Sequence, residues 1–205
     1  MNFTLDEKNI DVEYLAKNAM KDMDLLEKII KEVQSKKDTV RFNCHLILTY
    51  ISINNPKILY PYWNEFNFLL KSNNNYHKFI AIHLLASLTK IDKEMKFEKI
   101  VDAYFNILKE NRTMTAAHIA KKSGRIIKSK PLLEDKITNI LLNIETYHKG
   151  KQIELIKASV ISAFDEFYEI SKNKEKIMAF VKKQLNSESP STRKCSKEFL
   201  LKWST

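Results

Sequence analysis

The chain has 205 residues and a net charge of +10, from 35 Lys and Arg against 25 Asp and Glu, and its 44% hydrophobic residues are too many for a disordered chain. Only two Gly are present, which excludes a glycine-rich phosphate loop, a dinucleotide-binding fingerprint and most tight β-hairpins. With two Cys and no apolar run of 18 residues, we expect a cytoplasmic protein without a disulfide framework or a membrane span.

Apolar residues recur with the 3.6-residue period of helices almost throughout the chain, and polar breakers interrupt them at regular intervals. The pattern predicts a short helix near 11–20, followed by five helical hairpins with a first and a second helix each. Pro61 falls inside a predicted first helix, so that helix is expected to begin or bend there. The predicted hairpins cover 22–34 with 39–53, 57–72 with 76–91, 95–110 with 113–129, 132–147 with 151–171, and 173–186 with 190–204.

The hairpins are copies of one unit of about 38 residues. Apolar positions of the first helices align with gaps of 37, 37, 37 and 40 residues, and small residues of the second helices align with gaps of 37, 39, 40 and 36. One hairpin cannot cover its own apolar face, so we expect stacked hairpins that share a continuous core. The first-helix positions are Leu26, Trp63, Ile100, Ile137 and Ile177, each followed three residues later by Ile29, Phe66, Ala103, Ile140 or Phe180. The second-helix positions are Cys44, Ala81, Ala120, Val160 and Ser196, each followed seven residues later by Ile51, Leu88, Ile127, Phe167 or Trp203.

Two of the second helices carry related motifs, which are Val40-Arg41-x-x-Cys44 followed by Leu48 and Thr192-Arg193-x-x-Ser196 followed by Leu200. On these residues, and over about 22–204, the chain resembles the HEAT-repeat family of α-solenoids, as a small stand-alone member of prokaryotic type. The resemblance implies an all-α superhelix of about five hairpins, with a capping helix in residues 1–21 and a single array in 22–205. It also implies that the second helices line a concave surface.

Repeats three and four depart from the family pattern, because Ala117 stands at the usual basic position of repeat three and Phe164 replaces Leu in repeat four. We expect these repeats to stack with altered curvature. The motif identifies a fold and not a function.

No pattern in the chain predicts catalysis or metal binding. The five His are spread over four repeats without metal-ligand spacing, and Cys44 and Cys195 are explained by packing at small-residue positions. Asp165 and Glu169 share a helix face as an acid–base pair would, but a charged solvent face explains them equally well. We therefore expect a protein that is not an enzyme and that has no cofactor.

Positive charge is the informative feature of the sequence. Residues 112–130 contain six basic residues and no acidic one, and Lys121, Arg125 and Lys128 follow the spacing i, i+4, i+7 of a single helix stripe. A basic groove attracts phosphates or acidic protein segments. The predicted partner-binding residues are Lys121, Lys122, Arg125, Lys128, Lys78 and Arg41.

A second interpretation applies to the basic residues that lie three positions before the small residues of the second helices. In the HEAT-repeat family this residue usually joins a ladder of polar contacts between repeats, and the candidate partners in this chain are Asp38, Asn75 and Glu154. The basic residues at this position are Arg41, Lys78, Lys157 and Arg193.

These observations favour a monomeric binding scaffold that holds an acidic segment of a protein partner on its concave face. The first alternative is a protein that binds nucleic-acid phosphates through the same basic residues. A second alternative is enzymatic, because some HEAT-like solenoids are alkylpurine DNA glycosylases, for which Asp165 would stabilise an oxocarbenium ion. Those enzymes carry a Trp and an Asp four residues apart, and here Asn67 follows Trp63 at that spacing.

Overall fold

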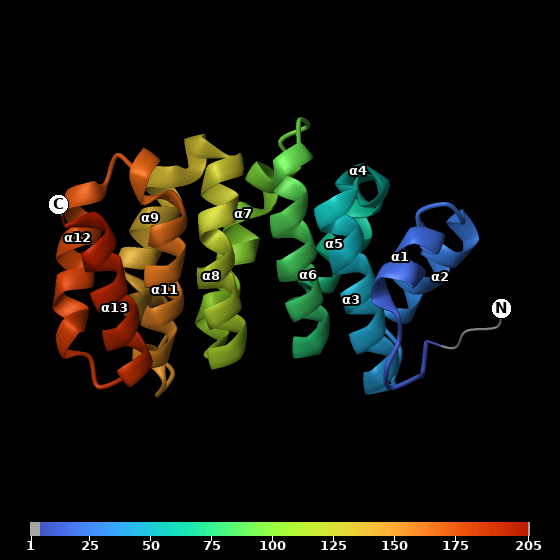
Figure 1. The fold of residues 1–205 in the computed structure, drawn as a ribbon, viewed down its shortest axis with the longest axis horizontal. Coiled ribbons are helices and arrows are strands. Elements are labelled where there is room, and N and C mark those ends of the chain that lie inside the picture. Colours follow the sequence, from blue (N-terminus) through green and yellow to red (C-terminus); the bar gives the residue numbers. More distant parts are fainter. Residues whose placement is uncertain (1–4, 205) are drawn as a thin grey trace. The chain divides into compact units, whose positions relative to one another are not determined.

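The computed structural model describes residues 5–204, and within that range all regular structure is helical and no strand occurs (Figure 1). The predicted all-α class is therefore confirmed. The chain divides into two compact units, Met1–Lys93 (unit 1) and Glu94–Thr205 (unit 2). The predicted single array of 22–205 extends over both units and stays a prediction, so each unit is described by itself.

Unit 1 contains the predicted short helix and the first two hairpins. The short helix α1 packs against α2 and α3, and α3 packs in turn against α6. The elements of unit 1 are α1 (Val12–Ala19), α2 (Met23–Glu32), α3 (Asp38–Asn54), α4 (Pro56–Leu59), the 3₁₀ turn η1 (Tyr60–Tyr62), α5 (Trp63–Leu69), α6 (Asn75–Leu88) and η2 (Thr89–Ile91).

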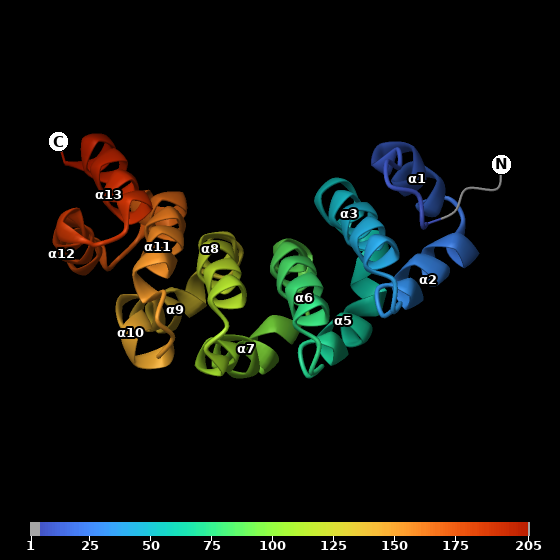
Figure 2. The ribbon, with the colours of Figure 1, turned by 90° about the horizontal axis from the view of Figure 1, so that it is seen from below.

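Unit 2 contains the other three hairpins in two layers. Its second helices α8, α11 and α13 lie side by side and form one layer. The first helices α7, α9 and α12 form the other layer (Figure 2). The elements of unit 2 are α7 (Lys96–Asn106), η3 (Ile107–Glu110), α8 (Thr113–Ser129), η4 (Pro131–Leu133), α9 (Glu134–Leu142), α10 (Ile144–Tyr147), α11 (Ile153–Phe167), η5 (Tyr168–Ile170), α12 (Lys174–Lys183), η6 (Gln184–Asn186) and α13 (Pro190–Trp203).

Local sequence explains where these helices begin and break. Asp11 and Asp22 accept backbone N–H bonds at the starts of α1 and α2, and Ser189 does so before α13, whose first residue is Pro190. The predicted helix 57–72 is interrupted by the 3₁₀ turn η1, which contains Pro61, because proline lacks the N–H that a continuous α-helix needs. The expected irregularity at this proline is confirmed.

The repeat pattern of the second helices predicts their core. The five small residues, from Cys44 in α3 to Ser196 in α13, are fully buried, and so are four of the five large residues that follow them. The fifth, Trp203, is half-buried. Small side chains at these positions let neighbouring helices approach closely, and the larger ones fill the space between them.

The predicted register of α7 was wrong. Ala103 is exposed and Ile100 is only half-buried, whereas Phe97, Val101 and Tyr104 are buried. The rings of Phe97 and Tyr104 pack edge to face with their centroids 5.2 Å apart. Burial of these large rings outweighs that of Ile100 and Ala103, and it turns the helix by about one residue relative to the repeat alignment.

Candidate partner-binding surface

The basic residues of α8 form one solvent-exposed stripe. The buried side of this helix combines large residues such as Ile119 and Ile127 with small ones such as Ala120 and Gly124. On the opposite side Lys121, Arg125 and Lys128 are exposed, as their spacing predicts, and Lys122 beside them is half-buried. We call these four residues, Lys121, Lys122, Arg125 and Lys128, the α8 basic face.

Positive charge on the α8 basic face is poorly balanced. Burial lowers the pKa of Lys122, and the neighbouring Arg125 lowers it further. Burial likewise lowers the pKa of His118, one turn earlier, with added contributions from Lys122 and Lys121. Within the described residues, Lys121, Lys122 and Lys128 have no carboxylate within 4 Å. An approaching anion would therefore meet an excess of positive charge.

One carboxylate lies next to this face, and the sequence pattern did not identify it. A Cβ atom placed on Gly124 would come within 2.7 Å of the Cβ of Glu166 and of the Ala163 carbonyl oxygen, so α8 and α11 are close together at this glycine. Desolvation at this contact raises the pKa of Glu166, although Arg125 and the three lysines of the face act to lower it. Glu166 is thus a single counter-charge beside four cations.

Arg41 and Lys78 do not belong to such a surface, which corrects the prediction for these two residues. Both lie in unit 1 and are only 8% exposed. Arg41 pairs with Asp38, donates to the Ser35 carbonyl oxygen at 2.5 Å and lies over the ring of Tyr76 at 5.3 Å. Its guanidinium fixes the turn before α3, as expected from the alternative in which this position takes part in structural polar contacts.

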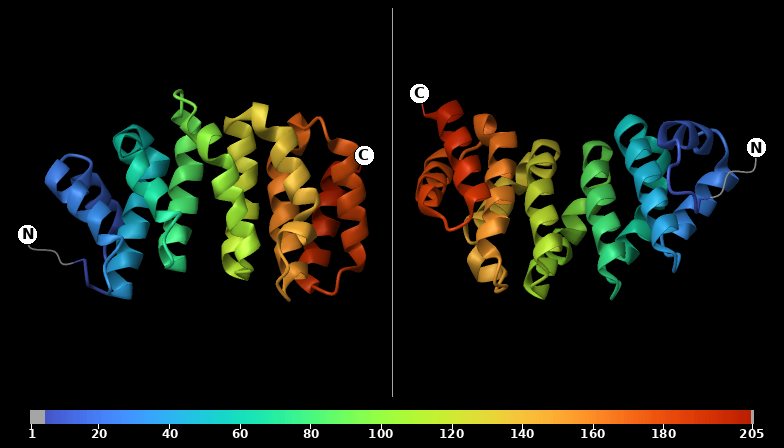
Figure 3. Two further views of the ribbon diagram at one scale, coloured as in Figure 1. Left: turned by 180° about the vertical axis from the view of Figure 1, so that it is seen from behind. Right: turned by 60° about the horizontal axis from the view of Figure 1, so that its bottom comes forward.

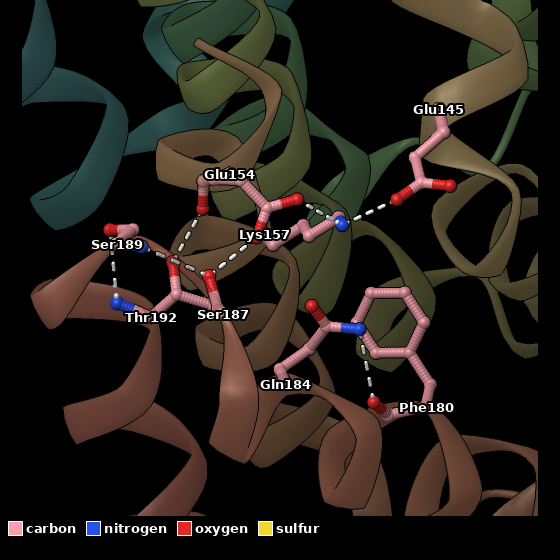
Figure 4. A network of polar contacts seen from close by, with 8 residues as sticks. All are labelled: Glu145, Glu154, Lys157, Phe180, Gln184, Ser187, Ser189 and Thr192. Carbon is pink, nitrogen blue, oxygen red and sulfur yellow. Dashed lines mark hydrogen bonds and ion pairs between the residues drawn. The ribbon is translucent and has the colours of Figure 1, made fainter.

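The equivalent position in α11 is occupied by Lys157, which is buried in a polar network (Figure 4). Its ammonium group pairs with Glu154 of the same helix and with Glu145 of α10. Glu154 also accepts from Ser187, and its backbone carbonyl accepts from Thr192. The network therefore joins three elements of unit 2, and Glu154 is the partner that the sequence indicated for Lys157.

Replacing Glu154 by Gln is expected to lower the free energy of unfolding by about 1.5 kcal/mol at pH 7, because the charge-assisted hydrogen bonds are weakened. Burial raises the pKa of Glu154, but hydrogen bonds from Lys157 and Ser187 outweigh this and hold the pKa below its ordinary value. Such a group stabilises the fold above its unfolded pKa and loses that contribution as the pH falls through its folded pKa.

The difference between wild type and the Glu154→Gln variant should therefore shrink in urea titrations below about pH 4. Glu188→Gln, at an exposed glutamate before α13, is the control and should leave stability unchanged. A difference that stays constant down to pH 2.5, or a control that behaves like the variant, would contradict this assignment.

Asp165 takes part in a contact between helices. Its carboxylate accepts from the indole N–H of Trp203 at 2.7 Å and from the ammonium of Lys202 at 2.9 and 3.1 Å. Beside it lies a cavity of about 190 Å³ between α11 and α13 that also contains Cys195. Burial raises the pKa of the Cys195 thiol, so the thiol is not activated as a nucleophile. Asp165 thus holds α13 against α11, and Glu169 is exposed in η5, the 3₁₀ turn that follows α11.

Candidate metal ligands do not converge anywhere in residues 5–204, where no group of three His, Cys, Asp or Glu side chains is placed to hold an ion. The thiols of Cys44 and Cys195 are both free, and burial raises the pKa of Cys44 to about 12. None of the helices described is both long and apolar enough to cross a bilayer. No sequence pattern indicated a ring cluster in unit 1, where His45 and His83 pack on Phe79 with centroids 4.7 and 4.4 Å away and on each other at 5.3 Å.

Comparison of the chain with protein-family models, with curated proteins and with solved structures gave no match.

Proposed function

We propose that the hairpins stack as a HEAT-like α-solenoid and that the chain is a non-enzymatic binding scaffold, whose α8 basic face binds an acidic segment of a protein partner. The recurrence of contacts supports the repeat arrangement. In unit 2, hydrogen bonds between residues 38 positions apart join Asn111 to Lys149, Glu134 to Lys172, Glu154 to Thr192 and Asp165 to Trp203. Each bond joins one hairpin to the next, so contacts between hairpins recur at about the repeat length.

The observation that carries the functional proposal is the excess of positive charge on α8, where Lys121, Lys122 and Lys128 have no carboxylate within 4 Å among the described residues. Charge is also uneven along the chain, because 22 basic and 14 acidic residues fall in unit 2 against 13 and 11 in unit 1. A protein segment is favoured over a single nucleic-acid strand because α8 carries no Phe, Tyr or Trp on which a base could stack. With the second helices on the concave side, as the resemblance implies, these cations would face the bound segment.

A binding experiment tests this proposal with a fluorescent, hydrophilic peptide of Glu, Asp, Ser and Gly. We expect the wild type to bind the peptide with an affinity that falls as salt rises, and Lys121→Glu/Arg125→Glu/Lys128→Glu to weaken binding by about tenfold or more. The control is Lys99→Glu/Lys172→Glu/Lys176→Glu, which changes the net charge equally at exposed lysines outside α8. Equal losses in both variants would show non-specific attraction and contradict the proposal.

The same variants distinguish the nucleic-acid alternative. For a protein that binds phosphates, the logarithm of the affinity for a 20-base-pair duplex should fall with the logarithm of the salt concentration by about 0.9 per phosphate contacted. Tighter binding of duplex than of peptide at about 50 mM salt, with a slope that flattens in the α8 variant, would replace the protein partner by nucleic acid.

A further inference from the structure

Beside η6, the helix α13 carries an apolar groove that the described residues of unit 2 leave open. Leu201 is 86% exposed and lines a shallow groove of about 500 Å³ together with Leu200 and with Leu185 of η6. The helix α13 packs against α11 and against α12 and η6 of its own hairpin (Figure 3), and the groove opens beside η6. A leucine exposed this far beside two half-buried leucines in one groove indicates a surface for interaction.

The repeat register shows what kind of element this face would receive. In α11, the residue five positions after the small residue Val160 is Asp165, which contacts the next helix, α13. In α13, the residue five positions after Ser196 is Leu201. Leu201 therefore occupies the position in α13 that Asp165 occupies in α11. Because Asp165 contacts the next helix, the side of α13 that carries Leu201 is one on which another helix can pack.

Groove geometry is consistent with a helical partner. Along α13 the lining residues are Lys197, Leu200, Leu201 and Ser204, with the spacing i, i+3, i+4, i+7 that a neighbouring helix packs against. The lining continues onto η6 through Leu185, so the groove has walls from two elements. An amphipathic helix laid in such a groove presents apolar residues at the same spacing.

The positive charge near the groove indicates which kind of helix would bind there. Residues 171–205 contain nine basic and three acidic residues. Lys197 lines the groove, and Lys182 and Lys183 are exposed at the end of α12, immediately before η6. A helix with acidic flanks complements Lys197 and the positive charge of this segment, whereas two copies of this face brought together would place like charges opposite each other.

We propose that the groove between η6 and α13 binds an amphipathic helix of a partner protein, with leucine-like residues on its apolar face and Asp or Glu on its flanks. This surface is separate from the α8 basic face, so the two proposals stand or fall independently. Bound in this way, the partner helix would stack on α13 as α13 stacks on α11, and Leu201 would be its central apolar contact.

The test uses the full chain and an 18-residue helical peptide with Leu at i, i+3, i+4 and i+7 and Glu on its flanks, measured by fluorescence anisotropy. We expect binding below about 1 mM peptide, and an affinity about tenfold lower or worse for Leu201→Glu. Leu132→Glu is the matched control, because Leu132 is a leucine on η4 that is 89% exposed. Both variants should melt as the wild type does, since neither side chain is packed.

Several results would overturn the proposal. The first is that the peptide does not bind at 1 mM, and the second is that wild type and Leu201→Glu bind it equally well. The third is that the charge reversals on α8, and not Leu201→Glu, weaken peptide binding. A peptide with Lys flanks that binds as well as the Glu peptide would also contradict it. Binding to anionic lipid vesicles, or concentration-dependent self-association, that is lost in Leu201→Glu while the peptide does not bind would assign the groove to a membrane or to a second copy.

Discussion

Replacing Ile127 by Asp is expected to destabilise unit 2 by about 4 kcal/mol or to unfold it. Ile127 lies on α8 with 1% of its side chain exposed, so the substitution removes buried apolar contacts and places a carboxylate among them. A buried carboxylate without a partner must either lose its hydration or become protonated, and both outcomes cost free energy. Urea denaturation and hydrogen exchange of the α8 and α11 segments measure the effect.

The control for Ile127→Asp is Lys128→Asp, which introduces the same residue one position later on the exposed stripe. Its expected cost is below about 1 kcal/mol, from the unfavourable placement of an acid near a helix C-terminus. Equal stability of Ile127→Asp and wild type would show that the register of α8 is wrong, and with it the assignment of Lys121, Arg125 and Lys128 to the exposed side.

Gly124→Val should destabilise the contact between α8 and α11 by about 2 kcal/mol or more. Helix propensity alone predicts the opposite sign, because Gly is the poorer helix former by several tenths of a kcal/mol. A Cβ at this position would lie 2.7 Å from the carbonyl oxygen of Ala163, and a backbone atom cannot move aside without moving α11. The added methyl groups of Val increase the overpacking.

Thermal or urea unfolding of Gly124→Val beside Ala117→Val isolates this effect. Ala117 lies on the same helix and is half-exposed, so valine there changes propensity without forcing two helices apart. A Gly124→Val protein that is as stable as the wild type would mean that α8 and α11 are further apart than described here.

The sequence predicts the helical hairpins well because their signals are local. Apolar periodicity and breakers such as Pro61 mark each element, and the small residues of the second helices mark where those helices approach each other. The register of α7 was missed because repeat spacing alone placed Ile100 and Ala103 in the core. Packing of aromatic rings, which decides that register, depends on neighbours distant in sequence.

Only part of the candidate site could be predicted, because burial depends on contacts between residues that are distant in sequence. Charge can be counted in a sequence, but burial cannot, and long Arg and Lys side chains are able to cover apolar surface while their charged groups bind nearby carbonyls and carboxylates. Arg41 therefore resembled Arg125 at the sequence level although only Arg125 is exposed. Glu166 was missed because its position beside Gly124 arises from the packing of α8 on α11.

The placement of the two tryptophans has a practical consequence. Trp63 is 2% exposed in unit 1, and Trp203 in unit 2 is half-buried and donates its indole N–H to Asp165. Each half of the chain thus carries its own intrinsic fluorophore, in a different environment from the other. Emission spectra recorded during denaturation can reveal, without any label, whether the two halves lose their structure together or one after the other.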